Sequence, residues 1–151
     1  MPNKSCCIIG QKIIKHEKRN DIFEPVQEKI NTLIDEGYNE FIFDACGKHF
    51  NDSISMVIFM QKLRQRDIKT VCYAMNDENA VELQEIYDKV ILHTIEKSKK
   101  FSIIDRYQAM IDNSDYCIFY IANKSGDLTK LIDYAKDKNK HFINIAQLKT
   151  D

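Results

Sequence analysis

Short apolar runs and helical apolar stripes alternate along the chain. The runs at residues 5–9, 41–43, 69–74, 116–121 and 141–145 predict β-strands. Between them, apolar residues recur every three or four positions and predict helices at residues 21–36, 52–66, 97–113 and 127–138, with a weaker helix near 81–87. The short apolar run at residues 89–93 fits either type. Asp21 can cap the start of the first helix, and Gly37 stands where a terminating glycine belongs.

The alternation of strands and helices determines the fold class that we predict. Strands separated by helices pair in parallel through right-handed crossovers. The strands are continuous apolar runs, as expected when helices cover both faces of a sheet. We therefore predict an α/β fold, a Rossmann-like three-layer sandwich with a mostly parallel five-stranded sheet. In such folds, ligands bind beyond the carboxyl ends of the strands, where the strand order reverses.

Length and composition narrow the partners that we expect. The 151 residues predict one domain over residues 1–151. The net charge of -1 gives no basic excess, which counts against a nucleic-acid partner. No apolar stretch approaches the roughly 20 residues of a membrane span, and the N-terminus lacks a signal-peptide pattern. We expect a cytoplasmic protein without a membrane partner.

The five cysteines do not form a metal or disulfide pattern. Four of them lie in apolar runs, where cysteine behaves as a small hydrophobic residue in a reducing compartment: Cys6, Cys7, Cys72 and Cys117. The four histidines lack ligand spacing with cysteines or carboxylates, so we expect no metal and no other cofactor. Cys46 lies in a loop, and a catalytic thiol there would need His49 as its base. Nearness in sequence is weak evidence for such a pair, and we assign no catalytic residue.

Three loops follow predicted strands and can meet at one edge of the sheet. Their candidate ligand-binding residues are Gly10, Gln11 and Lys12 in the first loop, Asp44, Ala45, Cys46, Gly47 and Lys48 in the second, and Ser125, Gly126 and Asp127 in the third, with Thr129 in the helix that follows. The third loop precedes a helix, whose first N–H groups lack internal partners and whose dipole favours an anion. A plain N-cap and turn explain the same residues. The Asp127 carboxylate would also occupy the position that an anion needs.

The candidate cations have two interpretations each. Lys12 and Lys48 can supply charge to a phosphate or be solvated surface lysines. Arg106, on the helix before the fourth predicted strand, can reach over the sheet edge as a bidentate phosphate ligand. It can equally pair with Asp105 or Asp112 on the surface.

Several segments resemble a known family. The segments CCIIG, LIDEGYNEFIF and MIDNSDYCIFY, followed by SG and IDYAKDKNKHFINI, are similar to the SLOG superfamily, in particular to its small stand-alone bacterial and phage members of unknown function. The resemblance covers nearly the whole chain. It implies a Rossmann-like fold with a nucleotide pocket at the strand carboxyl ends, and a homodimer formed through helical faces. Members of the superfamily include the Lonely-Guy phosphoribohydrolases, sensor domains for nucleotide signals such as ADP-ribose derivatives, and DNA-processing protein A.

The chain departs from the family pattern at its motifs. The segment Gly10-Gln11-Lys12 replaces Gly-His-Arg, and Arg106-Tyr107 replaces Arg-Asn. A Gly-Gly-Thr or Ser-Gly-Thr motif becomes Ser125-Gly126-Asp127, with Thr129 two places late. The catalytic glutamate of the Lonely-Guy enzymes has no counterpart, because the nearest carboxylate, Asp133, is out of register.

Three functions remain open from the sequence. The first is non-catalytic binding of a nucleotide or nucleotide-derived signal, ADP-ribose-like or cyclic, by a sensor or sequestering protein. The second is hydrolysis of a nucleotide N-glycosidic bond, as in the Lonely-Guy enzymes, which the missing glutamate disfavours. The third is a degenerate scaffold with a closed pocket that binds a protein partner. We favour the first.

Overall fold

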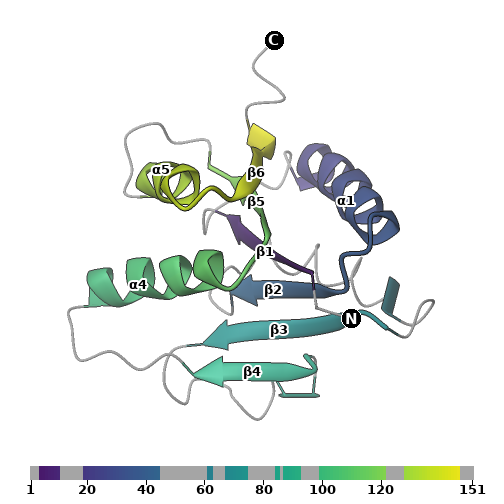
Figure 1. The fold of residues 1–151 in the computed structure, drawn as a ribbon, viewed down its shortest axis with the longest axis horizontal. Helices are drawn as coiled ribbons and strands as arrows, with labels where there is room; N and C mark the ends of the chain where they lie inside the picture. The colour runs from purple at the N-terminus through teal and green to yellow at the C-terminus, as the bar shows by residue number, and fades with distance from the viewer. Residues whose placement is uncertain are drawn as a thin grey trace.

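A six-stranded parallel sheet forms the centre of the molecule (Figure 1). The computed structural model describes residues 4–10, 19–44, 61–62, 67–74, 84–85, 87–92, 99–121 and 128–146. The strands lie in the order β4-β3-β2-β1-β5-β6, and each neighbouring pair is parallel. Their bounds are β1 Ser5–Gly10, β2 Glu40–Asp44, β3 Lys69–Ala74, β4 Lys89–Leu92, β5 Tyr116–Tyr120 and β6 His141–Asn144.

The predicted α/β fold with a parallel sheet is confirmed, but the predicted number of five strands is wrong. The sixth strand is β4, at the run that fitted either type. Four residues are too few to show a period, so length and pattern could not separate strand from helix there. β4 pairs with β3 at one edge of the sheet, and Lys89 at its start is exposed.

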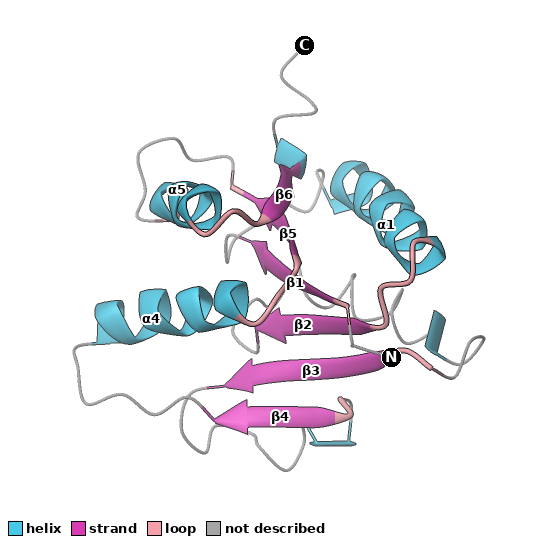
Figure 2. Cartoon of the chain, in the orientation of Figure 1, coloured by secondary structure: helices cyan, strands magenta, loops and turns pink. Residues whose placement is uncertain are grey.

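Among the described residues, helix α1 covers one face of the sheet, and α4 and α5 cover the other (Figures 1 and 2). Their bounds are α1 Arg19–Asp35, α4 Lys99–Asp112 and α5 Thr129–Asp137. Since α1 begins two residues earlier than predicted, Asp21 lies in its first turn and is not its cap. Within the described part of the chain, no helix is long and apolar enough to cross a membrane. The predicted helices at residues 52–66 and 81–87 lie largely outside the described residues, which are helical at 61–62 and 84–85.

Alternating residues of β1 supply the two halves of the core. Cys6 and Ile8 pack with α1, whereas Cys7 and Ile9 pack with α4 and α5. This follows from the strand geometry, in which successive side chains point to opposite faces. All four side chains are fully buried. The four cysteines predicted to be core residues are buried thiols. Burial raises the pKa of the Cys6 thiol well above its usual value, so Cys6 is a poor nucleophile.

Two helices end in the left-handed conformation that closes a Schellman motif. After α1, Gly37 has φ 98°, and Tyr38 N donates to Leu33 O at 2.9 Å. After α5, Asn139 takes the same role with φ 59°, and Lys140 N donates to the carbonyl five residues earlier at 2.9 Å. The predicted terminating glycine is therefore confirmed.

Substitutions at these two positions should change stability in opposite directions. A Cβ at Gly37 would meet nothing within 4 Å, so Gly37→Ala adds only backbone strain. We expect it to lower the free energy of unfolding by about 1 kcal/mol. Asn139→Gly relieves the same strain and should raise that free energy by a few tenths of a kcal/mol. Urea denaturation measures both, and a neutral Gly37→Ala variant would contradict the role given to this residue.

Asp88 fastens the start of β4 to β3. Its Oδ2 accepts the backbone N–H of Thr70 at 2.8 Å and the Thr70 hydroxyl at 3.3 Å. The Asp88 N–H donates back to Thr70 Oγ1 at 3.1 Å, and Lys62 donates to Asp88 Oδ1. Burial opposes ionisation of the Asp88 carboxyl, but the bonds from Lys62 and Thr70 outweigh it and hold its pKa below the usual value.

This lowered pKa predicts a loss of stability in acid. Folding favours the ionised Asp88, so its contribution is present above the unfolded pKa near 3.8 and is lost as the pH falls through the lower folded pKa. We expect wild type to be more stable than Asp88→Asn near neutral pH, and the difference to shrink steadily below about pH 4. Urea denaturation of both proteins across this pH range measures the difference. A constant difference down to the lowest pH would show that the charge does not contribute.

Candidate functional site

The strand order reverses beside β1. The chain places β2, β3 and β4 successively on one side of β1 and then returns to place β5 and β6 on the other side. The carboxyl ends of β1 and β5 therefore lie next to each other, with Gly10 in register with Tyr120. Crevices for ligands in open α/β sheets form at this kind of reversal.

Four of the predicted site residues are described. Gly10 ends β1, Asp44 ends the neighbouring β2, Arg106 lies on α4 and Thr129 opens α5. The structure brings Asp44 and Arg106 into contact. Gly10 and Asp44 lie at the same end of the sheet, because β1 and β2 are parallel neighbours. The other predicted residues lie outside the described residues: Gln11, Lys12, Ala45, Cys46, Gly47, Lys48, Ser125, Gly126 and Asp127.

A buried polar cluster joins the end of β2 to α4. We call Asp44, Arg106 and Tyr107 the Asp44 cluster. Arg106 Nη2 lies 3.0 Å from Asp44 Oδ1, and the Tyr107 hydroxyl donates to Asp44 Oδ2 at 2.7 Å. Arg106 is 0% exposed, Tyr107 1% and Asp44 2%. Both carboxylate oxygens of Asp44 are thus held from α4, out of contact with solvent.

The position of Arg106 differs from both interpretations of the sequence. The surface pair with Asp105 or Asp112 is wrong, because Arg106 is buried and its charge faces Asp44. A guanidinium that is 0% exposed also offers no open face to a phosphate in this conformation. Instead, Arg106 supports the end of β2.

A signal for the Asp44 cluster was present in the sequence. Ile104, Tyr107 and Ile111 continue one apolar stripe at helical spacing, which places Tyr107 toward the sheet. A carboxylate that ends a buried strand also needs a partner, because an unpaired buried charge is costly. Asp44 and Arg106 are separated by 61 residues, so no local pattern in the sequence reveals their pairing.

Asn144 is a polar residue near the switch point that sequence reasoning missed. Its Oδ1 accepts the Ile121 N–H at 3.0 Å, and its Nδ2 donates to the Ile121 carbonyl at 3.1 Å. The side chain is buried at the end of β6, which lies beside β5. It therefore fixes the backbone just where the chain leaves β5. The only sequence signal was an asparagine inside the apolar run FINI.

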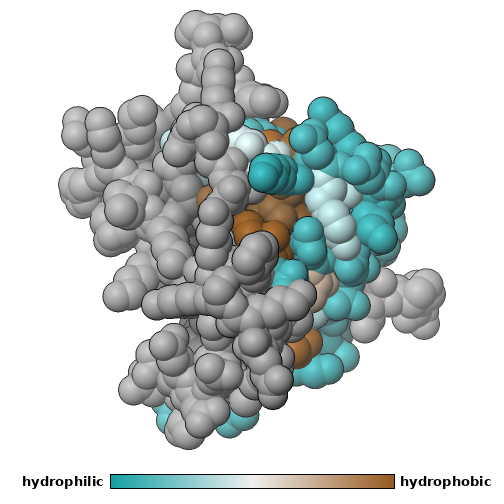
Figure 3. Space-filling model, turned by 90° about the vertical axis from the view of Figure 1, so that its left-hand side faces the viewer, coloured by the Kyte–Doolittle hydropathy of each residue, from teal (hydrophilic) through white to brown (hydrophobic). Residues whose placement is uncertain are grey.

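Hydrophobic and hydrophilic residues lie together at this end of the sheet (Figure 3). No group of three or more potential metal ligands occurs in the part of the chain that the structure describes. Figure 3 is seen from the side to which the strand arrows of Figure 1 point. It shows hydrophobic residues in the middle of the described part of this end, with hydrophilic residues beside them.

Comparison with protein-family models and with curated proteins identifies no relative of this chain. No protein-family model matches the sequence, and no curated protein matches it. The resemblance to the SLOG superfamily is therefore not tested by these comparisons and stays a proposal.

The Asp44 cluster predicts strong coupling between its two charges. Asp44→Asn removes the carboxylate charge beside the buried Arg106, and Arg106→Met removes the guanidinium charge beside the buried Asp44. We expect each single substitution to lower the free energy of unfolding by about 3–5 kcal/mol. The double variant should lose clearly less than the sum, because it leaves no unpaired charge.

Urea denaturation of the four proteins in this cycle measures the coupling. Tyr107→Phe is the matched control, since it removes one donor to Asp44 and no charge, at a cost of about 1–3 kcal/mol. Additive single losses would mean that Arg106 and Asp44 do not stabilise each other.

Proposed function

We propose that the protein binds a nucleotide or a nucleotide-derived signal, such as an ADP-ribose-like molecule or a cyclic nucleotide, without turning it over. The proposed site lies at the carboxyl ends of β1 and β5. The observation that carries the proposal is the reversal of strand order between these two strands, with Gly10 and Tyr120 in register at their ends. The SLOG resemblance supports the same ligand class.

The start of α5 supplies the anion-binding part of the proposed site. Leu128 stands at the N-cap position and makes no side-chain capping bond. The first N–H groups of a helix have no acceptors within the helix, and the dipole places partial positive charge there. These groups would bind a ligand phosphate, while Gly10, which lacks a side chain, would allow the ligand close to the end of β1.

Support for binding without turnover comes from the environments of two carboxylates, Asp44 and Asp133. Asp44 has both oxygens occupied by Arg106 and Tyr107. Asp133, the carboxylate nearest the family's catalytic position, is exposed on α5. We therefore assign the Asp44 cluster a structural role, holding the end of β2 beside the site, and assign no general acid or base.

A thermal-shift screen tests the proposed function. The panel holds adenine and guanine nucleotides, ADP-ribose, its cyclic isomers, NAD and cyclic dinucleotides. A ligand at 100 times its Kd stabilises the folded protein by about 2.7 kcal/mol, which raises the Tm of a chain of this size by about 5–10 °C. Chromatography of the recovered ligand should show it unchanged. A flat panel would contradict the proposal and favour the scaffold function.

Thr129→Asp tests the place of binding. A carboxylate in the first turn favours the helix itself, so the Tm without ligand should be kept, but it repels a phosphate. We expect the ligand-induced shift to fall by more than half. The control, Lys138→Gln, makes the same change in net charge at the other end of α5 and should keep the full shift. Equal shifts in both variants would place the ligand elsewhere.

A further inference from the structure

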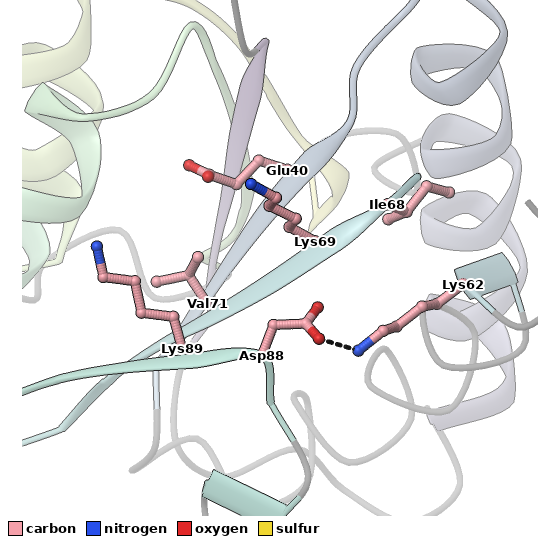
Figure 4. Close-up of a pocket in the computed structure, with 7 residues that line it drawn as sticks. All are labelled: Glu40, Lys62, Ile68, Lys69, Val71, Asp88 and Lys89. Atoms are coloured by element: carbon pink, nitrogen blue, oxygen red, sulfur yellow. Dashed lines mark hydrogen bonds and ion pairs between the residues drawn. The ribbon is translucent and has the colours of Figure 1, made fainter. Parts of the chain in front are cut away.

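A hollow lies at the end of the strands opposite to the proposed nucleotide site. It has a volume of about 570 Å³ and is lined, at the amino ends of β2, β3 and β4, by Glu40, Lys62, Ile68, Lys69, Val71, Asp88 and Lys89 (Figure 4). This volume is within the range of about 300–1,000 Å³ in which small-molecule sites fall. No local pattern in the sequence indicates the hollow, because its residues come from three strands and one helical segment.

The two carboxylates of the hollow already have donors. Glu40 Oε1 accepts the Ser5 hydroxyl at 2.9 Å. Asp88 is held by Lys62 and by the backbone and hydroxyl of Thr70. Among the residues that the structure describes, the ammonium groups of Lys69 and Lys89 make neither a hydrogen bond nor an ion pair. Three lysines and two carboxylates line the hollow, and Glu40 is in register with Lys69, so the net charge of the lining is +1.

Strand register places these two lysines on one face. Lys89 is in register with Val71 on β3, and Lys69 precedes Val71 by two residues on the same strand. Residues two apart on a strand, and residues in register on neighbouring strands, share a face. Figure 4 shows Lys69 and Lys89 extending to the same side as Val71, while Ile68 and Lys62 lie on the other side. Val71 is 4% exposed and belongs to the core beside the two lysine stems.

We propose that this hollow binds a small dianion with a short carbon skeleton, whose charged groups contact Lys69 and Lys89. A lysine ammonium is a point charge that binds phosphate and carboxylate alike. The shared chemistry is the double negative charge, which a phosphate monoester and a dicarboxylate both supply. A monoanion leaves one of the two ammonium groups without a partner and binds more weakly.

Amide chemical-shift mapping of the ¹⁵N-labelled protein tests this inference. The probes are glycerol 3-phosphate and succinate, which separate the two sources of dianion, with acetate at equal ionic strength as the monoanion control. At least one dianion should shift the amides of Lys69, Val71 and Lys89 saturably, and acetate should bind about tenfold more weakly. The inference is overturned if no dianion shifts these amides, or if acetate binds as tightly.

Matched variants test the two lysines. Lys69→Gln/Lys89→Gln replaces exposed residues and should keep the Tm, while dianion binding weakens about tenfold per lysine. Lys136→Gln/Lys138→Gln makes the same change in net charge on α5 and should leave binding unchanged. Equal losses in both double variants would show general charge attraction and overturn the inference.

The outcome is independent of the proposed nucleotide site. The two sites lie at opposite ends of the strands, so Thr129→Asp should leave dianion binding intact. Likewise, Lys69→Gln/Lys89→Gln should keep any nucleotide-induced thermal shift.

Discussion

The complete burial of β1 is the constraint on which the structure depends. Every residue of this strand is buried, with β2 on one edge, β5 on the other and helices over both faces. A strand covered in this way is predominantly apolar, and neighbours on both edges require the chain to cross over in both directions. The reversal of strand order, and with it the place where a ligand can approach the backbone, follows from the position of β1.

The Asp44 cluster shows how a buried charge can be tolerated at such an edge. Asp44 ends a strand whose other inward positions are apolar, and its two oxygens are taken by consecutive residues of α4. A buried pair of this kind contributes little net stability compared with apolar residues, but removing one partner is strongly destabilising. The pair therefore ties the position of α4 to the end of β2. Asn144 ties β6 to the end of β5 in the same manner, through the backbone of Ile121.

How far the sequence predicts this structure depends on the range of each interaction. The apolar runs of five strands and the stripes of α1, α4 and α5 are local patterns, and they are sufficient for the fold class. The sequence did not identify β4 as a strand, because four residues are too few to show a hydrophobic period. The Arg106–Asp44 pair, the Asn144 bonds and the hollow at the amino ends arise between segments distant in sequence, where single residues give no pattern. The loops that carry most predicted site residues lie outside the described residues, so their roles stay predictions.

Hydrogen exchange of backbone amides tests the central claim, that a nucleotide-derived ligand binds where β1 and β5 end. The protein would be compared alone and with ADP-ribose or a cyclic nucleotide at saturating concentration. The account predicts slower exchange at Gly10, at Ile121 and in the first turn of α5, and unchanged exchange at the amino ends of β3 and β4. Unchanged exchange at the carboxyl ends with every nucleotide, or protection only at the opposite edge, would contradict it.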